Sequence, residues 1–413
     1  MTLNILAIGD TADTIYTFKK FAKEVQIRLI AFPRKQDALL TTSEEGIEFF
    51  DSLLISKQVK RIKKIKDNFD ICLVMSWAAA RVAYLAGLNY VMYFTGNDIM
   101  TPPFIKNPHE SYLDKSLQSL NFFERIFYKK VLDSAAKCVT TTVPYYNNLK
   151  KYRSDAVRID RAWSDTELFN ERVKPINLPK SKFTFLSAQK IGLEKGFDII
   201  WEALRLCKSD FELLQVKWFT ERTEEEKKIN QKLLEDAPPQ VKFIPLIKRN
   251  KIPNYIIFAD AILGQMRSGI QGSIERDSAL CKKPILCYTN PNMPLVIDGK
   301  EIIPPFLPKT RDPQDLAELI DKIVEFKEFR EKLAKEEHNF VMEIVNHEKT
   351  MKEWINIFND ILKDKTIDRN IQSIKNKIEN LIVNLIEKLF YVRKMREKNI
   401  NAWGKAEYER LTK

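Results

Sequence analysis

Histidine and cysteine are the scarcest residue types in this chain, and neither forms a functional pattern. The three histidines lack any HxH, HxxxH or HExxH spacing. Neither a catalytic zinc site nor a histidine-centred hydrolase is therefore indicated, although a single histidine acting as a base stays open. The five cysteines are scattered and odd in number, without a CxxC pair. This pattern predicts reduced, mostly buried thiols rather than a disulfide framework.

Long apolar runs are also missing. The most apolar stretch, residues 82–94, is interrupted by a glycine and an asparagine and is too short to span a bilayer. Residues 3–8 read as a first strand, without the basic start and cleavage site of a secretory signal. We therefore expect a cytoplasmic protein. No repeat of solenoid length and no low-complexity tract is evident.

Charge is plentiful and mostly positive, since 68 Lys and Arg outnumber 56 Asp and Glu for a net charge of +12. This balance favours an anionic partner, and phosphorylated metabolites, acidic lipid head groups and nucleic acid all qualify. Nucleic acid is the least favoured, because no recognisable nucleic-acid module is present. A chain of 413 residues with 44% hydrophobic content predicts two globular domains.

Short apolar runs alternate with longer helix-period segments, which is typical of parallel sheets with crossover helices. The predicted strands are 3–8, 27–31, 71–75, 90–93 and 138–142, then 183–188, 214–218, 241–244, 261–263 and 284–287. The clearest predicted helices are 14–23, 78–86, 120–134, 198–206 and 223–234, followed by 315–326, 328–345 and 350–362. We therefore predict an α/β fold of two Rossmann-like domains that face each other across a cleft.

Two prolines, Pro175 and Pro179, interrupt both periodicities and indicate a domain boundary within residues 169–182. The predicted units are an N-terminal domain over 1–172, a C-terminal domain over 173–345, a closing helix over 346–365 and a helical extension over 366–413.

The extension is predicted to be a basic amphipathic helix. Apolar residues recur there at three- and four-residue steps, and 11 Lys and Arg against 6 Asp and Glu give a net charge of +5. Its apolar stripe could pack on the protein's own surface or on a second copy, which would make a homo-oligomer. It could also lie peripherally on an anionic membrane, or contact a partner protein. The sequence leaves these alternatives open.

Lys190 and Lys195 lie between the predicted strand 183–188 and a helix that begins after Gly196. A strand end with cationic side chains, followed by a helix N-terminus, gathers ammonium groups and free backbone N–H groups around one small volume. This arrangement predicts a phosphate-binding site.

The same segment resembles a known family. Residues 190–198 are similar to the G-R-L-x-x-x-K-G-x-D segment of retaining GT-B glycosyltransferases of the group 1 type. Further similar segments follow in order: residues 241–245 (V-x-F-x-G), 255–261 (Y-x-x-A-D-x) and 275–285 (E-A-M-A-C-G-K-P-V), with 164–169 (G-V-D-x-x-x-F) upstream. The resemblance covers roughly residues 1–362 and implies a nucleotide-sugar-binding C-terminal domain opposite an acceptor-side N-terminal domain.

Several site residues are implied by this resemblance. Lys190 and Lys195 take the places of the arginine and lysine that hold the donor diphosphate, which makes both donor-binding and catalytic. The family's E-x7-E motif is half present: Asp277 replaces the second glutamate, the usual ribose ligand, and Gly269 replaces the first. Glu275 is the nearby carboxylate that could substitute for the first glutamate.

On the donor side, Gly272 matches a family glycine whose backbone N–H could approach the donor. On the acceptor side, the loop at Gly9 and Asp10 resembles the first loop of the family, and Thr95, Gly96, Asn97 and Asp98 resemble its H-G-S/T-D segment. An ordinary strand-to-helix turn remains the alternative for the first loop, and a turn stabilised by the Asn and Asp side chains for the second.

The resemblance implies a glycosyltransferase of the hexosyl type that moves a sugar from a nucleoside diphosphate sugar to a hydroxyl acceptor with retention of configuration. The acceptor could be a glycan, a lipid-linked molecule or a small molecule, and glycan biosynthesis is the implied process. No metal or other cofactor is expected, because the lysines supply the positive charge. The alternative is a non-catalytic relative that binds a sugar nucleotide or acts as a scaffold.

Overall fold

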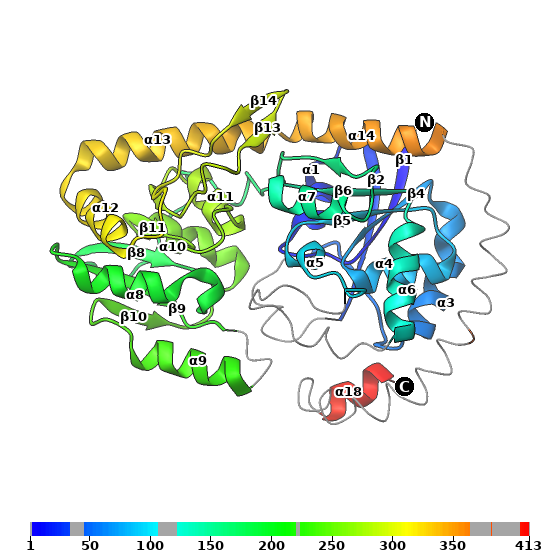
Figure 1. The fold of residues 1–413 in the computed structure, drawn as a ribbon, viewed down its shortest axis with the longest axis horizontal. Coiled ribbons are helices and arrows are strands. Elements are labelled where there is room, and N and C mark those ends of the chain that lie inside the picture. The colour runs from blue at the N-terminus through cyan, green and yellow to red at the C-terminus, as the bar shows by residue number, and fades with distance from the viewer. Residues whose placement is uncertain are drawn as a thin grey trace.

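The structure is a computed structural model that describes residues 2–33, 45–105, 122–219, 224–363, 381 and 405–412. Two parallel β-sheets lie side by side, one from each half of the chain, and helices pack around both (Figure 1). The predicted α/β fold with two Rossmann-like halves is therefore confirmed.

Within the described residues, the first sheet has seven parallel strands in the order β3-β2-β1-β4-β5-β6-β7. They are β1 (Leu3–Ile8), β2 (Val25–Ala31), β3 (Glu48–Phe49), β4 (Ile71–Met75), β5 (Tyr90–Phe94), β6 (Lys137–Thr140) and β7 (Val157–Arg158). The helices of this half are α1 (Thr14–Phe21), α3 (Ile55–Ile65), α4 (Trp77–Ala86), α5 (Asn97–Met100), α6 (Phe122–Asp133) and α7 (Val143–Lys150), with a 3-10 turn η1 (Lys66–Asn68). Continuous apolar runs such as β4 and β5 are buried at every residue, because helices cover both faces.

The second sheet has the order β10-β9-β8-β11-β12 in the described part of the chain. Its strands are β8 (Phe183–Ser187), β9 (Phe211–Val216), β10 (Val241–Ile244), β11 (Ala261–Leu263) and β12 (Ile285–Leu286), and a hairpin joins β13 (Leu295–Ile297) to β14 (Lys300–Ile302). The helices are α8 (Phe197–Leu206), α9 (Glu224–Glu235), α10 (Ile252–Phe258), α11 (Ser273–Leu280), α12 (Pro313–Glu325) and α13 (Lys327–Ile344), with 3-10 turns η3 (Leu193–Lys195) and η4 (Arg249–Lys251). The strand order reverses between β8 and β11, which is where open parallel sheets bind ligands.

Helix α14 (His347–Lys363) leaves the second half and packs on the first sheet (Figure 1). Trp354 is 1% exposed there, and its ring lies 5.7 Å from that of Phe18 and 4.9 Å from that of Tyr93. The two halves therefore share a core cluster as well as a linker.

A buried arginine fixes the crossing between the halves. Arg161 is 2% exposed and lies in the segment after β7. Its guanidinium bonds to Asp298 of the β13–β14 turn at 2.6 Å and to Glu353 of α14 at 3.1 Å, and it also donates to the carbonyl of Glu343 in α13 at 2.7 Å. One side chain thus holds three later segments against the linker.

The C-terminal helix α18 (Lys405–Thr412) packs on the first half, beside the start of α3. The carbonyl of Leu411 accepts hydrogen bonds from the Leu53 N–H at 2.9 Å and the Ser52 hydroxyl at 2.8 Å, and Tyr408 and Leu411 are buried. Apart from Leu381, the rest of the predicted 366–413 helix lies outside the described residues, so membrane or partner contact stays a prediction. Among the helices that are described, none is long and apolar enough to cross a bilayer.

Most predicted elements lie within a few residues of the observed ones, and two strands shift. The run predicted at 214–218 is β9 at Phe211–Val216, because its first residues pair with β8. The strand predicted to reach Thr142 ends at Thr140, since Thr142 has a φ of +59° and leads into α7. Helices α3, α5, α7, α10 and α11, strands β3 and β7, and the β13–β14 hairpin were not predicted.

We expect that Trp354→Ala lowers the free energy of unfolding by about 3–5 kcal/mol, because it opens a cavity in the shared core. Urea denaturation measures this loss. Lys352→Ala is the matched control on the same helix, since its side chain is 68% exposed; a change of no more than about 0.5 kcal/mol is expected for it. Equal effects of the two substitutions would contradict the role given to α14.

Candidate active site

The carboxyl edges of the two sheets meet at the junction of the two halves. Asp13, in the loop after β1, forms an ion pair with Arg249, which follows β10. Tyr93, near the end of β5, lies within electrostatic reach of Arg276 on α11. Ligands of open parallel sheets bind at this edge, so the junction is where a ligand of either sheet is expected.

The two predicted lysines lie on either side of the end of β8. The Lys190 ammonium is 4.7 Å from the ring centre of Trp218, which follows β9. The Lys195 ammonium is 3.4 Å from Oε1 of Gln265, which follows β11. Helix α8 begins two residues after Lys195, so two ammonium groups and a helix N-terminus surround one strand end, an arrangement suited to an anion.

Glu275 has both carboxylate oxygens engaged by its own loop. Oε2 accepts from the Gly272 N–H at 2.8 Å, and Oε1 accepts from the Gln265 N–H at 3.1 Å. The side chain therefore caps the start of α11 and fixes the loop after β11. The predicted roles of Glu275 and Gly272 toward a donor stay predictions, and either would need these bonds to rearrange.

Gly269, at the position of the absent glutamate, has a left-handed backbone, which favours glycine, in a crowded place. Its φ is +73°, and an added Cβ would lie 2.7 Å from Cβ of Asn290 and 3.0 Å from the backbone nitrogen of Asn290. A larger residue is strained there in both conformation and space. The missing carboxylate is thus part of how this loop is built.

Asp277 is fully buried and paired with a cation. Its Oδ2 lies 2.9 Å from Nη1 of Arg249, whereas Oδ1 has no hydrogen-bond partner in the part of the chain that the structure describes. Burial raises the pKa of Asp277, and the nearby Arg249 guanidinium opposes that rise. Arg249 also contacts Asp13 at 3.3 Å and lies 4.5 Å above the ring centre of Phe169.

The first loop uses its predicted residues for structure. Asp10 accepts hydrogen bonds from the Ile15 and Tyr16 N–H groups at 2.9 and 3.1 Å, so it caps α1. Gly9 has a φ of +79°, and a Cβ there would lie 2.4 Å from the carbonyl oxygen of Met75. An acceptor-side role for either residue stays a prediction, and Asp13 is the residue of this loop that reaches the second half.

The segment from Thr95 to Asp98 forms the turn into α5. Oδ1 of Asp98 accepts from the Gly96 N–H at 3.1 Å and the Ile99 N–H at 3.0 Å. Desolvation raises the pKa of Asp98 to about 6, even though these N–H groups favour the charged form. The predicted turn stabilised by Asp98 is therefore present. The structure describes Thr95 and Gly96 as partly buried and says nothing of the Asn97 side chain.

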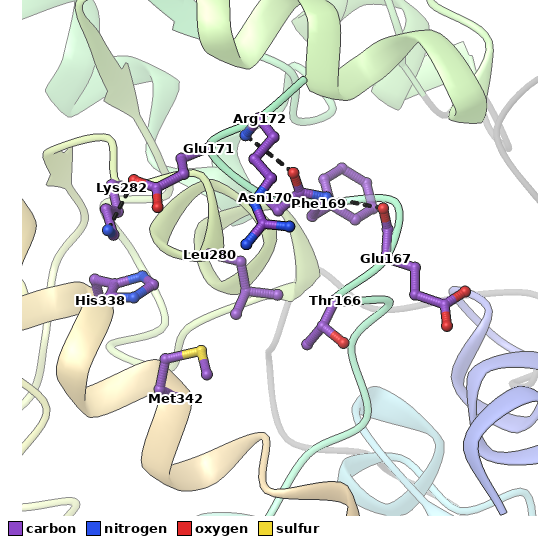
Figure 2. Close-up of a pocket in the computed structure, with 10 residues that line it drawn as sticks. All are labelled: Thr166, Glu167, Phe169, Asn170, Glu171, Arg172, Leu280, Lys282, His338 and Met342. Carbon is purple, nitrogen blue, oxygen red and sulfur yellow. Dashed lines mark hydrogen bonds and ion pairs between the residues drawn. The ribbon is translucent and has the colours of Figure 1, made fainter. Parts of the chain in front are cut away.

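A hollow of about 500 Å³ lies away from these residues, against the linker and helices α11 and α13 (Figure 2). The Glu171 carboxylate lies 2.7 Å from the Lys282 ammonium on its wall. The hydrogen bond and charge of Lys282 lower the pKa of Glu171, and the charges of His338 and Arg172 add smaller effects in the same direction. The Glu171 carboxylate therefore offsets the positive charges around the hollow. The hollow is therefore less suited to a diphosphate than the end of β8.

Sequence reasoning missed Asp13, Arg249, Trp218 and Gln265. Trp218 is the last residue of the predicted strand 214–218, and Gln265 lies two residues after the predicted strand 261–263. These positions at strand ends could have marked both as site residues. Arg249 lies in the basic run Lys248–Lys251, where nothing local separates it from solvated charges. Within the described residues, no group of three or more His, Cys, Asp and Glu is arranged to hold a metal ion.

Residues 169–340, which include the second sheet, match the family model of glycosyl transferases group 1. A comparison with curated proteins finds no match.

The structure is similar to several solved ones. HepE from Anabaena, crystallised with UDP and glucose, is 13% identical with a TM-score of 0.63, and the match covers 87% of this chain and 100% of that one. Sucrose-phosphate synthase from Thermosynechococcus elongatus is 14% identical with a TM-score of 0.62, and the match covers 87% of this chain and 99% of that one. A glycosyltransferase from Rickettsia africae is 16% identical with a TM-score of 0.60, and the match covers 88% of this chain and 100% of that one. The chain therefore has the two-domain GT-B fold that these structures share.

The raised pKa of Asp98 predicts a pH-dependent stability. Folding favours the protonated carboxyl, so its contribution is fully present below the unfolded pKa of about 3.8 and is lost as the pH rises through about 6. Between pH 4 and pH 7 the free energy of unfolding of the wild type should fall by about 2 kcal/mol more than that of Asp98→Asn. Asparagine keeps the acceptor oxygen and does not titrate. Urea denaturation at both pH values measures this difference. The Asp51→Asn variant, at an exposed position, should lose as much unfolding free energy between the two pH values as the wild type. An equal loss in all three proteins would refute the assignment to Asp98.

Proposed function

We propose that this protein is a glycosyltransferase that moves a hexose from a nucleoside diphosphate sugar to a hydroxyl acceptor with retention of configuration. The observation that carries the proposal is the placement of Lys190 and Lys195 around the end of β8, inside the segment that matches the group 1 model. The GT-B fold supports it, because HepE with that fold is crystallised with UDP and with UDP-glucose.

The lysines would stabilise the departing diphosphate. Negative charge develops on this leaving group as the glycosidic bond stretches, and fixed cations beside it lower the barrier by a few kcal/mol, on the order of one oxyanion-hole donor. Lysine keeps the charge of the family's arginine at position 190 but lacks its bidentate fork. Asp277 would accept a ribose hydroxyl through Oδ1, which has no partner within the described residues.

The acceptor hydroxyl would be deprotonated by the departing phosphate on the same face of the sugar, which is what retention requires. This chemistry needs no protein base and fits a chain with three histidines. The loops at Gly9–Asp10 and Thr95–Asp98 would border the acceptor. A glycan, a lipid-linked molecule or a small molecule remain the candidate acceptors.

Two observations favour a non-catalytic relative as the second candidate. Gly269 replaces the motif glutamate in a left-handed backbone that excludes larger residues, and Glu275 is engaged by backbone N–H groups instead of facing open space. A protein that binds a sugar nucleotide without transferring the sugar would be compatible with both features.

A donor panel separates the two candidates. Purified protein is incubated with UDP- and GDP-sugars, with and without membrane extract as an acceptor source, and sugar release and product anomer are measured by NMR. We expect the wild type to release sugar and the Lys190→Ala/Lys195→Ala double variant to lose this activity. Binding of UDP or GDP without release of sugar from any donor would end the catalytic proposal and favour the second candidate.

We expect Lys195→Ala to weaken UDP binding roughly tenfold, because one charge-assisted contact to phosphate is removed. Uridine binding should change little, since uridine carries no phosphate. Calorimetric titration with both ligands gives the comparison. Lys208→Ala is the control, because Lys208 is an exposed lysine that precedes β9, at the opposite edge of the same sheet. Equal losses for UDP and uridine would contradict the phosphate contact.

A further inference from the structure

Arg249 lies between two carboxylates that belong to different halves of the chain. Its Nη1 is 2.9 Å from Oδ2 of Asp277 on α11, and its Nε is 3.3 Å from Oδ2 of Asp13 in the loop after β1. All three side chains are largely removed from solvent, at 13%, 1% and 3% exposure for Arg249, Asp277 and Asp13. A planar guanidinium suits this task, because it presents separate N–H groups to two acceptors at once.

The linker holds the guanidinium from a third side. The ring of Phe169 lies 4.5 Å from the Arg249 guanidinium carbon, and Phe169 itself is fully buried. Figure 2 shows Phe169 on the linker segment beside the hollow, next to Asn170 and Glu167. Ring, guanidinium and two carboxylates therefore form one contact between the linker, the first half and the second half.

The two carboxylates of this contact oppose each other. Burial raises the pKa of Asp277, the Arg249 and Arg276 charges lower it, and the negative charge of Asp13 raises it further, so Asp13 and Asp277 repel each other across the junction. The contact with Asp13 is also the longer of the two. When the halves separate, Asp13 regains water while Arg249 keeps its shorter contact with Asp277, so the Asp13 contact is the one that breaks.

Asp277 has a free acceptor that the contact encloses. Its Oδ1 is buried and has no hydrogen-bond partner in the described part of the chain, and Asp277 as a whole is 0% exposed. A ligand hydroxyl could satisfy this oxygen, but it cannot reach a fully buried side chain unless a group packed against Asp277 moves, and Arg249, which Asp13 holds from the first half, is such a group.

We propose that Arg249 is an interdomain clasp whose contact with Asp13 must break before a nucleotide reaches Asp277, and whose contact with Asp277 then holds that carboxylate in place for the ligand. This inference rests on the proposed function, because it takes a nucleoside diphosphate as the ligand at Asp277. Arg249 acts through Asp277 and is a positioning residue.

Asp13→Asn tests the clasp with little risk to folding. Asparagine tolerates the left-handed backbone of residue 13, whose φ is +57°, and removes only the charge. Asp155→Asn is the control: it also removes the charge of a carboxylate paired with an arginine, since Asp155 lies 2.8 Å from Arg153, but both residues belong to the first half. Asp155 is not among the proposed ligand-binding residues.

The first measurement needs no ligand. The distance between the halves is measured by double electron–electron resonance. Spin labels are attached through Lys60→Cys on α3 and Lys228→Cys on α9, two exposed positions, in a Cys207→Ser background. Asp13→Asn should move the distance distribution toward longer distances, and Asp155→Asn should match the wild type. An unchanged distribution in Asp13→Asn, or the same shift in both variants, would overturn the clasp.

The second measurement is the rate of UDP binding, followed by the fluorescence of Trp218 beside Lys190. If the open form that can bind UDP is about a tenth of the wild-type population, a variant that is fully open should show an apparent affinity and an association rate up to roughly tenfold higher. We expect Asp13→Asn to bind UDP faster than the wild type and Asp155→Asn to bind at the wild-type rate. An unchanged rate in Asp13→Asn would refute the gating step. A wild type that binds neither UDP nor GDP would count against the proposed function, while the spin-label distances would still decide whether the clasp exists.

Discussion

The buried guanidinium of Arg161 is the interaction on which the arrangement of the two halves depends. It lies where the chain leaves the first sheet, and it is neutralised by Asp298 and Glu353, which come from segments more than 130 residues further along the chain. A buried charge that loses its partners is costly, so these segments are held to the linker. Helix α14 then reaches the first sheet, where Trp354 is packed. The position of Arg249 opposite Asp13 is a consequence of this crossing.

The junction therefore combines two kinds of polar group. Lys190 and Lys195 are placed by the end of one strand, and their position follows from the topology of the second sheet alone. Asp13, Arg249 and Asp277 come together only because the two halves meet. In the proposed function the first group would supply positive charge for a phosphate, and the second links the Asp277 carboxylate to the first half. Binding and closure could in this way act on the same small set of side chains.

The loop from Gly264 to Gly272 departs from the family's pattern for a structural reason. Glu275 caps α11 and holds the loop through Gln265, and the left-handed Gly269 lies against Asn290. A glutamate at position 269 would be strained in both backbone and space. The departure is thus built into the backbone conformation, and it is the feature that separates the two proposed functions.

The sequence by itself determined the fold class, most strands and helices and the position of the two lysines, because apolar periodicity and strand ends are local properties. Helix α3 could also have been predicted, since Ile55, Val59 and Ile62 recur at helical spacing, and the Asp298-Gly299 pair is a typical hairpin turn. Only the tertiary structure decided that Glu275 and Asp10 cap helices, that α18 packs on the first half, and that Arg249 joins Asp13 to Asp277. The physical reason is that a charged side chain in a basic chain has no local feature that distinguishes a solvated surface position from a buried ion pair. That distinction depends on which distant carboxylates the fold brings within about 3 Å of it.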